Sequence, residues 1–130
     1  MPIELKYLVA SVLLFIVMIA AQALMGIAYQ GFMPLIGSRD SLKDDTVLIG
    51  RAKRANQNMI EAMVLFTPLI LVAAQTNNLN ATTALGAALF FWGRAAFAPL
   101  YWVGVAWLRT LVWFVSVIGL LMILSQILPF

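Results

Sequence analysis

Long runs of apolar residues alternate with short polar stretches along this chain. The apolar runs cover residues 7–29, 59–74, 81–98 and 102–130. A helix needs about 20 mostly apolar residues to cross the hydrocarbon core of a bilayer, and each run approaches or exceeds that length. The pattern therefore predicts an all-α integral membrane protein built as a four-transmembrane-helix bundle.

The second helix is expected to be longer than a membrane is thick. A polar segment, RAKRANQN at residues 51–58, leads directly into the second apolar run. Ahead of it, Ser41, Asp44 and Asp45 suit a helix cap and an acidic first turn. A helix over 45–74 is about 45 Å long at about 1.5 Å per residue, whereas the hydrocarbon core is about 30 Å thick. We therefore predict that the polar segment projects into water.

A single domain accounts for the whole chain. Predicted helices at about 4–29, 45–74, 81–98 and 102–128 leave only short connections within residues 1–130. Apolar residues make up 64% and charged residues 10% of the chain, far from the composition of a soluble domain. Lys6 and Ala21-Gln22-Ala23 imitate a secretory signal with its cleavage site, but the apolar run is too long for a signal core. We expect a retained first helix.

Residue types that are missing exclude several kinds of chemistry. The chain has no cysteine and no histidine, which removes disulfides, thiolate nucleophiles, histidine bases and the usual zinc sites. Only five acidic residues exist, and Asp40, Asp44 and Asp45 crowd one connection, so no metal site is predicted. A reactive sulfur must arrive with a ligand.

The placement of basic residues predicts the topology. Five of the eight Lys and Arg residues lie between the first and second apolar runs, and the connection QTNNLNATT after the second run carries none. The positive-inside rule then puts the first connection, residues 30–58, in the cytoplasm and both termini outside. We expect a multi-pass protein of a bacterial inner membrane. The net charge of +3 suits contact with anionic lipid and requires no nucleic acid.

The outer connection carries one motif of its own. Asn80-Ala81-Thr82 forms an N-glycosylation sequon, which matters only in a eukaryotic secretory pathway. Asparagine is also a favoured N-cap residue, and a predicted helix begins at residue 81. We prefer the cap.

Polar residues of the second helix form a stripe. At about 100° per residue, Arg51, Arg54, Asn58 and Glu61 fall within an arc of about 80°. A solvated helix end is enough to explain Arg51. It does not explain Glu61, because an acid inside a membrane span is costly unless it faces the bundle interior or a cavity. This stripe is the first candidate site.

A second stripe follows on the third and fourth helices. Arg94 shares one side of its helix with Tyr101, and Pro99 is expected to kink or end the helix, which would place Tyr101 in a tight turn. Arg109 and Thr110 come about two turns into the fourth helix. Arg94 and Arg109 either snorkel to the headgroups or serve a site. The four tryptophans are interpreted as belt and packing residues.

Both stripes belong to the cytoplasmic leaflet. Together they offer several guanidinium groups, one carboxylate and a few neutral polar groups beside apolar surface. Arginine binds carboxylates through two parallel hydrogen bonds, and a carboxylate can hold an ammonium group. The sequence therefore predicts a site for a small, polar, multiply charged anion, next to a lipophilic partner. A zwitterionic peptide with two carboxylates meets this description.

The sequence resembles the MAPEG family, the membrane-associated proteins of eicosanoid and glutathione metabolism. Arg-Ala-x-x-Asn-x-x-Glu, ending at Glu61, is similar to the signature of the family's second helix. RAAFAPLY followed by LRTLVW is similar to the arginine, aromatic, tyrosine and arginine pattern of its third and fourth helices. Chain length, four spans and a long second helix match as well, so the resemblance covers essentially the whole chain.

The resemblance implies a homotrimer that binds glutathione as co-substrate between adjacent subunits. By position, Arg54, Asn58 and Glu61 would hold the polar ends of the tripeptide, and Arg94 and Tyr101 would contact it. The implied binding residues are Arg51, Arg54, Asn58, Glu61, Arg94, Tyr101 and Thr110, and the implied catalytic residues are Arg109 and Tyr101.

The resemblance also implies how the thiol reacts. A thiol with a pKa of about 8.5 is mostly protonated at neutral pH, and a nearby guanidinium favours the thiolate. Arg109 would face the sulfur, although Thr110 beside it stays an alternative. We expect a transferase or peroxidase that acts on lipophilic electrophiles or hydroperoxides.

Two other functions remain open from the sequence. A small proton-coupled four-helix transporter would need a carboxylate near the middle of the first span, where the sequence has none. A non-catalytic trimeric membrane protein could use the same pocket to bind lipid or glutathione, and nothing in the sequence excludes it.

Overall fold

The chain folds into four long helices and one short helix in a computed structural model that describes residues 1–37 and 44–128. The long helices are α1 (Ile3–Gln30), α3 (Val47–Gln75), α4 (Ala81–Val103) and α5 (Ala106–Ile127), and the short one is α2 (Phe32–Ile36). Each long helix is long and apolar enough to cross a membrane. No strand occurs within the described ranges. The predicted all-α membrane bundle is confirmed.

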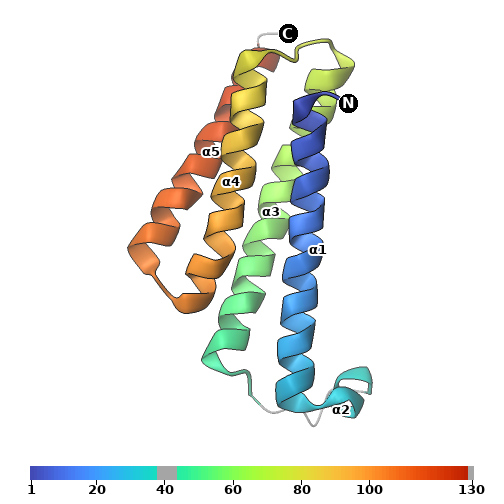
Figure 1. The fold of residues 1–130 in the computed structure, drawn as a ribbon, viewed down its shortest axis with the longest axis vertical. Coiled ribbons are helices and arrows are strands. Elements are labelled where there is room, and N and C mark those ends of the chain that lie inside the picture. The colour runs from blue at the N-terminus through green and yellow to red at the C-terminus, as the bar shows by residue number, and fades with distance from the viewer. Residues whose placement is uncertain (38–43, 129–130) are drawn as a thin grey trace.

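The four long helices lie side by side along one axis (Figure 1). The first turn of α1 and the last turn of α5 lie at one end of the bundle, and α2 lies at the other, which we call the α2 end. Helix α3 has 29 residues and is about 44 Å long at about 1.5 Å per residue. Its first turns extend beyond the turn between α4 and α5 (Figure 1). Its polar beginning therefore extends past α4 and α5 and lies beside α1.

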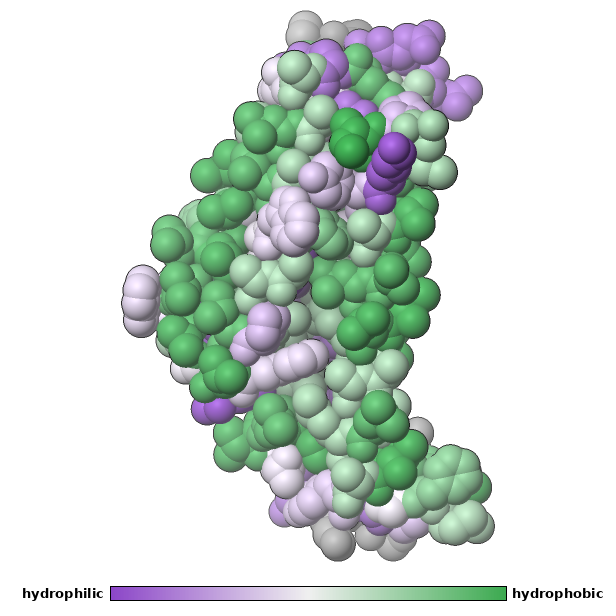
Figure 2. Space-filling view, viewed as in Figure 1, coloured by the Kyte–Doolittle hydropathy of each residue, from purple (hydrophilic) through white to green (hydrophobic). Residues whose placement is uncertain are grey.

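The surface has the character expected of a protein that contacts lipid. Apolar residues cover most of the visible face along the middle of the bundle, and hydrophilic residues gather toward its two ends (Figure 2). Large exposed apolar side chains occur on all four long helices; examples are Leu13, Val64, Trp92 and Leu121. In lipid such side chains need no cover, because the solvent is itself apolar.

Helix caps decide where two of the spans begin. The Asn80 side chain accepts hydrogen bonds from the backbone N–H groups of Thr82 and Thr83 at 2.9 and 3.0 Å, and the Thr83 hydroxyl accepts the Asn80 N–H. This capping box confirms the cap interpretation of Asn80.

The cap of α3 differs from the prediction. The Thr46 hydroxyl accepts the N–H of Ile49 at 3.1 Å, so Thr46 is the N-cap and the helix starts at Val47. Asp44 and Asp45 precede the cap, and Asp45 instead pairs with Lys53. Ser41 lies outside the described residues. The cap lies later in the chain than predicted because the Thr46 hydroxyl accepts a hydrogen bond from a backbone N–H of the first helical turn, which would otherwise have no partner.

Helix α4 continues past Pro99, which the sequence predicted either to kink or to end the helix. A proline inside a membrane helix is tolerated where neighbouring groups satisfy the freed carbonyl, and Pro68 lies inside α3 in the same way. The helix ends at Gly104, whose φ of 82° is the left-handed conformation of a C-cap. Tyr101 therefore lies in the last turn of α4 and not in the turn that follows.

Small residues bring α4 and α5 into close contact. A Cβ atom added to Gly86 would lie 2.7 Å from the carbonyl oxygen of Gly119, and one added to Gly93 would lie 3.0 Å from the carbonyl oxygen of Val112. The first distance is shorter than real Cβ atoms adopt, so only glycine fits at Gly86, and the second is tighter than most real contacts. Close backbone approach through small residues is a common way to pack helices in membranes.

The apolar interior is divided into two clusters along the bundle. The cluster away from α2 contains Phe66 and Phe90, whose stacked rings have centroids 3.9 Å apart. The cluster nearer α2 contains Met59 and Phe97. On α4, Arg94 lies between Phe90 and Phe97, so this charged residue occupies the boundary between the two clusters.

Candidate functional site

Arg94 is the largest fully buried side chain among the described residues, with 1% of its surface exposed. Its Nη1 donates a hydrogen bond of 2.7 Å to Oδ1 of Asn58 on α3. Its guanidinium carbon lies 4.4 Å from the ring centroid of Phe97, close enough for a cation–π interaction. The sequence left snorkelling open for Arg94, and the structure turns this side chain inward.

The remaining donors of Arg94 have no acceptor in the described part of the chain. Its Nε and Nη2 atoms are buried and make no hydrogen bond there. A buried charged donor without an acceptor loses its hydration and gains nothing in return. The Nε and Nη2 atoms of the guanidinium group can therefore donate hydrogen bonds to an anion from outside the chain.

A cavity of about 140 Å³ adjoins Arg94 between α3, α4 and α5. Its polar lining comes from Asn58, Glu61, Arg94 and Ser116. The rest of its wall is apolar and consists of Ala62, Leu65, Trp113, Val117 and Leu120. We call this space the Arg94 cavity. A guanidinium group, a carboxylate and an apolar wall line it.

Glu61 lies on α3 three residues after Asn58, and its side chain is exposed at the edge of the Arg94 cavity. Among the described residues the single ion pair joins Lys53 and Asp45, so Glu61 does not neutralise Arg94 by direct contact. The cavity thus offers separate positive and negative groups. This arrangement can bind a ligand that carries both a carboxylate and an ammonium group.

Tyr101 brings two of the other three predicted arginines, Arg54 and Arg109, together. The Nε of Arg54 donates to the Tyr101 hydroxyl at 3.3 Å. The guanidinium carbon of Arg109 lies 4.3 Å from the centroid of the same ring. One tyrosine on α4 therefore joins cations from α3 and α5. On α5, Trp113 and Ser116 lead from Arg109 toward the Arg94 cavity, whose wall both residues line.

Two predicted site residues make other contacts. Arg51 donates from Nη1 to the carbonyl oxygen of Trp102 at 3.4 Å, and its guanidinium lies against Gly104 in the α4–α5 turn. The hydroxyl of Thr110 donates to the carbonyl oxygen of Ala106 in its own helix at 3.0 Å. In this single chain, neither side chain joins the group around Arg94 or Tyr101.

The structure adds residues that the two stripes did not include. Ser116 and Trp113 line the Arg94 cavity, although the sequence interpretation assigned Trp113 to packing. Ser116 lies seven residues after Arg109, two helical turns along the same side of α5, and that spacing is the signal that could have found it.

A buried amide pair was also missed. Asn56 donates from Nδ2 to Oε1 of Gln22 on α1, and Asn56 has 7% of its surface exposed. At about 100° per residue, Asn56 points away from the candidate stripe, and Gln22 within the first apolar run was the matching signal. The pair ties α1 to α3 and does not reach the Arg94 cavity.

The model of the MAPEG family matches residues 7–128 of the 130-residue chain. The match includes every candidate residue of the two stripes. No curated protein and no solved structure matched the chain.

Proposed function

The chain belongs to the MAPEG family, and from that premise we propose that it is a membrane enzyme that binds glutathione at the Arg94 cavity. Its reaction would be conjugation of the glutathione thiol to lipophilic electrophiles, or reduction of hydroperoxides. One observation carries the proposal: Arg94 is buried in a membrane span, and two of its nitrogen atoms, Nε and Nη2, donate to no described residue.

The donor set fits the charges of glutathione, which carries two carboxylates and one ammonium group. The free edge of the Arg94 guanidinium suits one carboxylate, because a guanidinium can donate two parallel hydrogen bonds to it. Glu61 suits the ammonium group. Arg54 lies one turn before Asn58 toward the α2 end and is exposed, so it suits the second carboxylate.

Self-association would complete this site. A cavity of about 140 Å³ is smaller than the roughly 300–1,000 Å³ of typical ligand sites, so one chain encloses only part of a tripeptide. In addition, Arg54, Gln57 and Glu61 are exposed on one side of α3. A carboxylate that faces lipid is costly. A second copy that covers this side would remove that cost, which supports the homotrimer implied by the family resemblance.

The proposed mechanism needs no protein nucleophile. Arg109 lies beside Tyr101 at the α2 end, where its positive charge would favour the thiolate of bound glutathione. The thiolate sulfur attacks the electrophilic carbon, a sulfur–carbon bond forms, and the leaving group departs with the electrons of its bond. Tyr101 and Arg54 would hold the tripeptide in place. The lipophilic substrate would arrive from the membrane.

The proposal includes an orientation of the protein in the membrane, with the α2 end on the cytoplasmic side. The α2 end carries Arg51, Lys53 and Arg54 among the described residues, and positive charge marks the cytoplasmic side of a membrane protein. Glutathione would then enter from the cytoplasm of the cell, with the protein in a bacterial inner membrane.

Calorimetric titration of the detergent-solubilised full chain with glutathione tests the proposal. We expect saturable heat in the unmodified protein and none in Arg94→Met, in which a side chain of similar length lacks the guanidinium. Lys6→Gln is the matched control, because it also removes a cation, at the end of the bundle away from α2. Absence of heat with millimolar glutathione in the unmodified protein would exclude the proposed function.

A further inference from the structure

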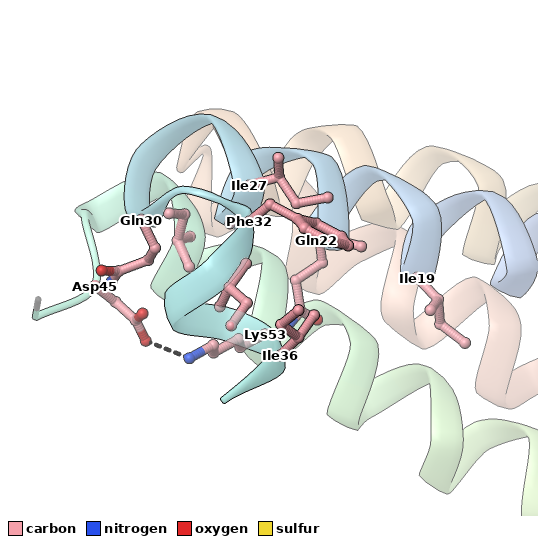
Figure 3. A pocket seen from close by; sticks show the side chains of 12 residues that line it. Ile19, Gln22, Ile27, Gln30, Phe32, Ile36, Asp45 and Lys53 are labelled. Atoms are coloured by element: carbon pink, nitrogen blue, oxygen red, sulfur yellow. Dashed lines mark hydrogen bonds and ion pairs between the residues drawn. The ribbon is translucent and has the colours of Figure 1, made fainter. Parts of the chain in front are cut away.

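A second and larger cavity lies between α1, α2 and the beginning of α3 (Figure 3). Its volume is about 360 Å³, within the roughly 300–1,000 Å³ of small-molecule sites. It shares no lining residue with the Arg94 cavity. We call it the α2 cavity.

One part of the α2 cavity is charged. Lys53 and Asp45 both line it, and Nζ of Lys53 lies 2.7 Å from Oδ2 of Asp45. Figure 3 shows this pair beside α2, with Gln30 close to Asp45. Their side chains are 51% and 37% exposed, and exposed ion pairs are weak. A ligand with its own charges can therefore compete for both groups.

Apart from Gln22 and Gln30, the rest of the α2 cavity is lined by apolar residues and glycine, and it follows a membrane span. Ile19, Ala23 and Ile27 line it from successive turns of α1, and Ile19 lies farthest from the charged pair (Figure 3). Helix α2 contributes Phe32 and Ile36, which are 58% and 59% exposed. The apolar wall thus runs from the charged end toward the hydrocarbon region of the bilayer.

We propose that the α2 cavity binds a membrane phospholipid with a phosphoethanolamine headgroup. The phosphate contacts Lys53, the ammonium contacts Asp45, and one acyl chain lies along Ile19, Ala23 and Ile27. A headgroup with only negative charge would face the carboxylate of Asp45. A choline headgroup carries a quaternary nitrogen without N–H and cannot donate a hydrogen bond to that carboxylate.

Native mass spectrometry of the full chain tests this selectivity. The protein is released from micelles that contain equal amounts of phosphatidylethanolamine, phosphatidylglycerol and phosphatidylcholine. We expect phosphatidylethanolamine to be retained about threefold to tenfold more than the other two, the range expected of one typical hydrogen bond. Equal retention of the three lipids would show lipid bound only as a general annulus and would overturn the proposal.

Charge variants identify the contacts. Asp45→Asn should remove the preference for phosphatidylethanolamine over phosphatidylcholine, and Lys53→Gln should lower retention of both lipids. Lys6→Gln makes the same change as Lys53→Gln at the opposite end of the molecule and should leave retention unchanged. If Lys6→Gln lowers retention as much as Lys53→Gln, overall charge explains the binding and the proposal fails.

A steric variant tests the apolar wall without touching the charged pair. Ala23→Phe fills the α2 cavity, whereas Ala20→Phe places the same ring on an exposed part of α1 that does not line it. We expect only Ala23→Phe to lose phosphatidylethanolamine. Equal retention by both variants would overturn the proposal. Glutathione titration of the same samples reports on the Arg94 cavity separately, so each proposal can fail without the other.

Discussion

Arg94 and Asn58, 36 residues apart in the chain, meet in a hydrogen bond of 2.7 Å inside the bundle. The guanidinium belongs to α4 and its acceptor to α3, and both line the Arg94 cavity. The bond satisfies one nitrogen of a buried charge, and Nε and Nη2 have no partner among the described residues. If glutathione binds there as proposed, stability and ligand binding depend on the same side chain, and substitutions can separate the two effects.

Asn58→Leu should destabilise the protein. The change leaves Nη1 of Arg94 buried without its acceptor, which costs about 1–3 kcal/mol of unfolding free energy. Thermal unfolding in detergent measures it. Replacing both partners by apolar groups is far less costly than removing one, so Asn58→Leu combined with Arg94→Met should recover most of the loss. Losses that simply add in the double variant would contradict a direct coupling between these residues.

Glu61→Gln should weaken glutathione binding with little effect on the fold, because this side chain is exposed at the cavity edge. Loss of one charge-assisted contact corresponds to about 1–3 kcal/mol in binding free energy, measured by calorimetry. Glu4→Gln is the matched control: Glu4 is buried at the end of the bundle away from α2, where it accepts the Thr83 hydroxyl at 2.8 Å. An equal loss of affinity in both variants would argue against a ligand contact at Glu61.

Arg109→Leu should raise the pKa of the bound glutathione thiol toward its free value of about 8.5, because a positive charge beside the thiolate is removed. The ultraviolet absorbance of the thiolate, followed against pH, measures the change. Conjugation of a halonitrobenzene should slow at neutral pH by up to about tenfold per pKa unit and recover as the pH rises.

Arg109→Lys is the control for charge. The thiol pKa and the conjugation rate of this variant should lie between those of the unmodified protein and Arg109→Leu, because lysine keeps the positive charge and loses the planar guanidinium. If Arg109→Leu conjugates as fast as the unmodified protein, Arg109 has only a structural role. The activating group would then have to be sought at Tyr101, Thr110 or Arg94.

Gly119→Ala should destabilise the bundle, because its Cβ would meet the carbonyl oxygen of Gly86 on α4. Overpacking of this kind costs about 1–3 kcal/mol. Gly26→Ala makes the same change on α1, where the new Cβ would be 3.5 Å from a Leu35 methyl group, an ordinary contact. Thermal unfolding should separate the two variants. Similar melting temperatures for both would refute the importance of the α4–α5 approach.

Much of the fold was predictable because it depends on local properties. Apolar runs of spanning length identify the four transmembrane helices whatever their neighbours do, since a backbone in lipid must satisfy its own hydrogen bonds. The cap at Asn80 was predictable for the same reason, as its partners lie within the next turn. The end of α4 was not. Pro99 marks a local preference, and the left-handed Gly104 determines the actual end.

The candidate site was predictable only as two separate stripes. Helical periodicity places Arg54, Asn58 and Glu61 on one side of α3, and the family motif selects them from other polar residues. Periodicity says nothing about how one helix is rotated against the next. Asn58 could therefore be assigned to the site, but its hydrogen bond to Arg94 could not be predicted. The contacts of Tyr101 with both Arg54 and Arg109 could not be predicted either.

The sequence by itself determined the membrane class, the four spans, the long second helix and membership of the MAPEG family, because each depends on residues close together in the chain. The tertiary structure decided which polar groups meet. Close contact of α4 and α5 at Gly86 and Gly119 sets the rotation of both helices. That packing directs Arg94 inward to Asn58, and it leaves Arg51 at the α4–α5 turn. Those contacts arise from the packing of whole helices, which no local stretch of sequence specifies.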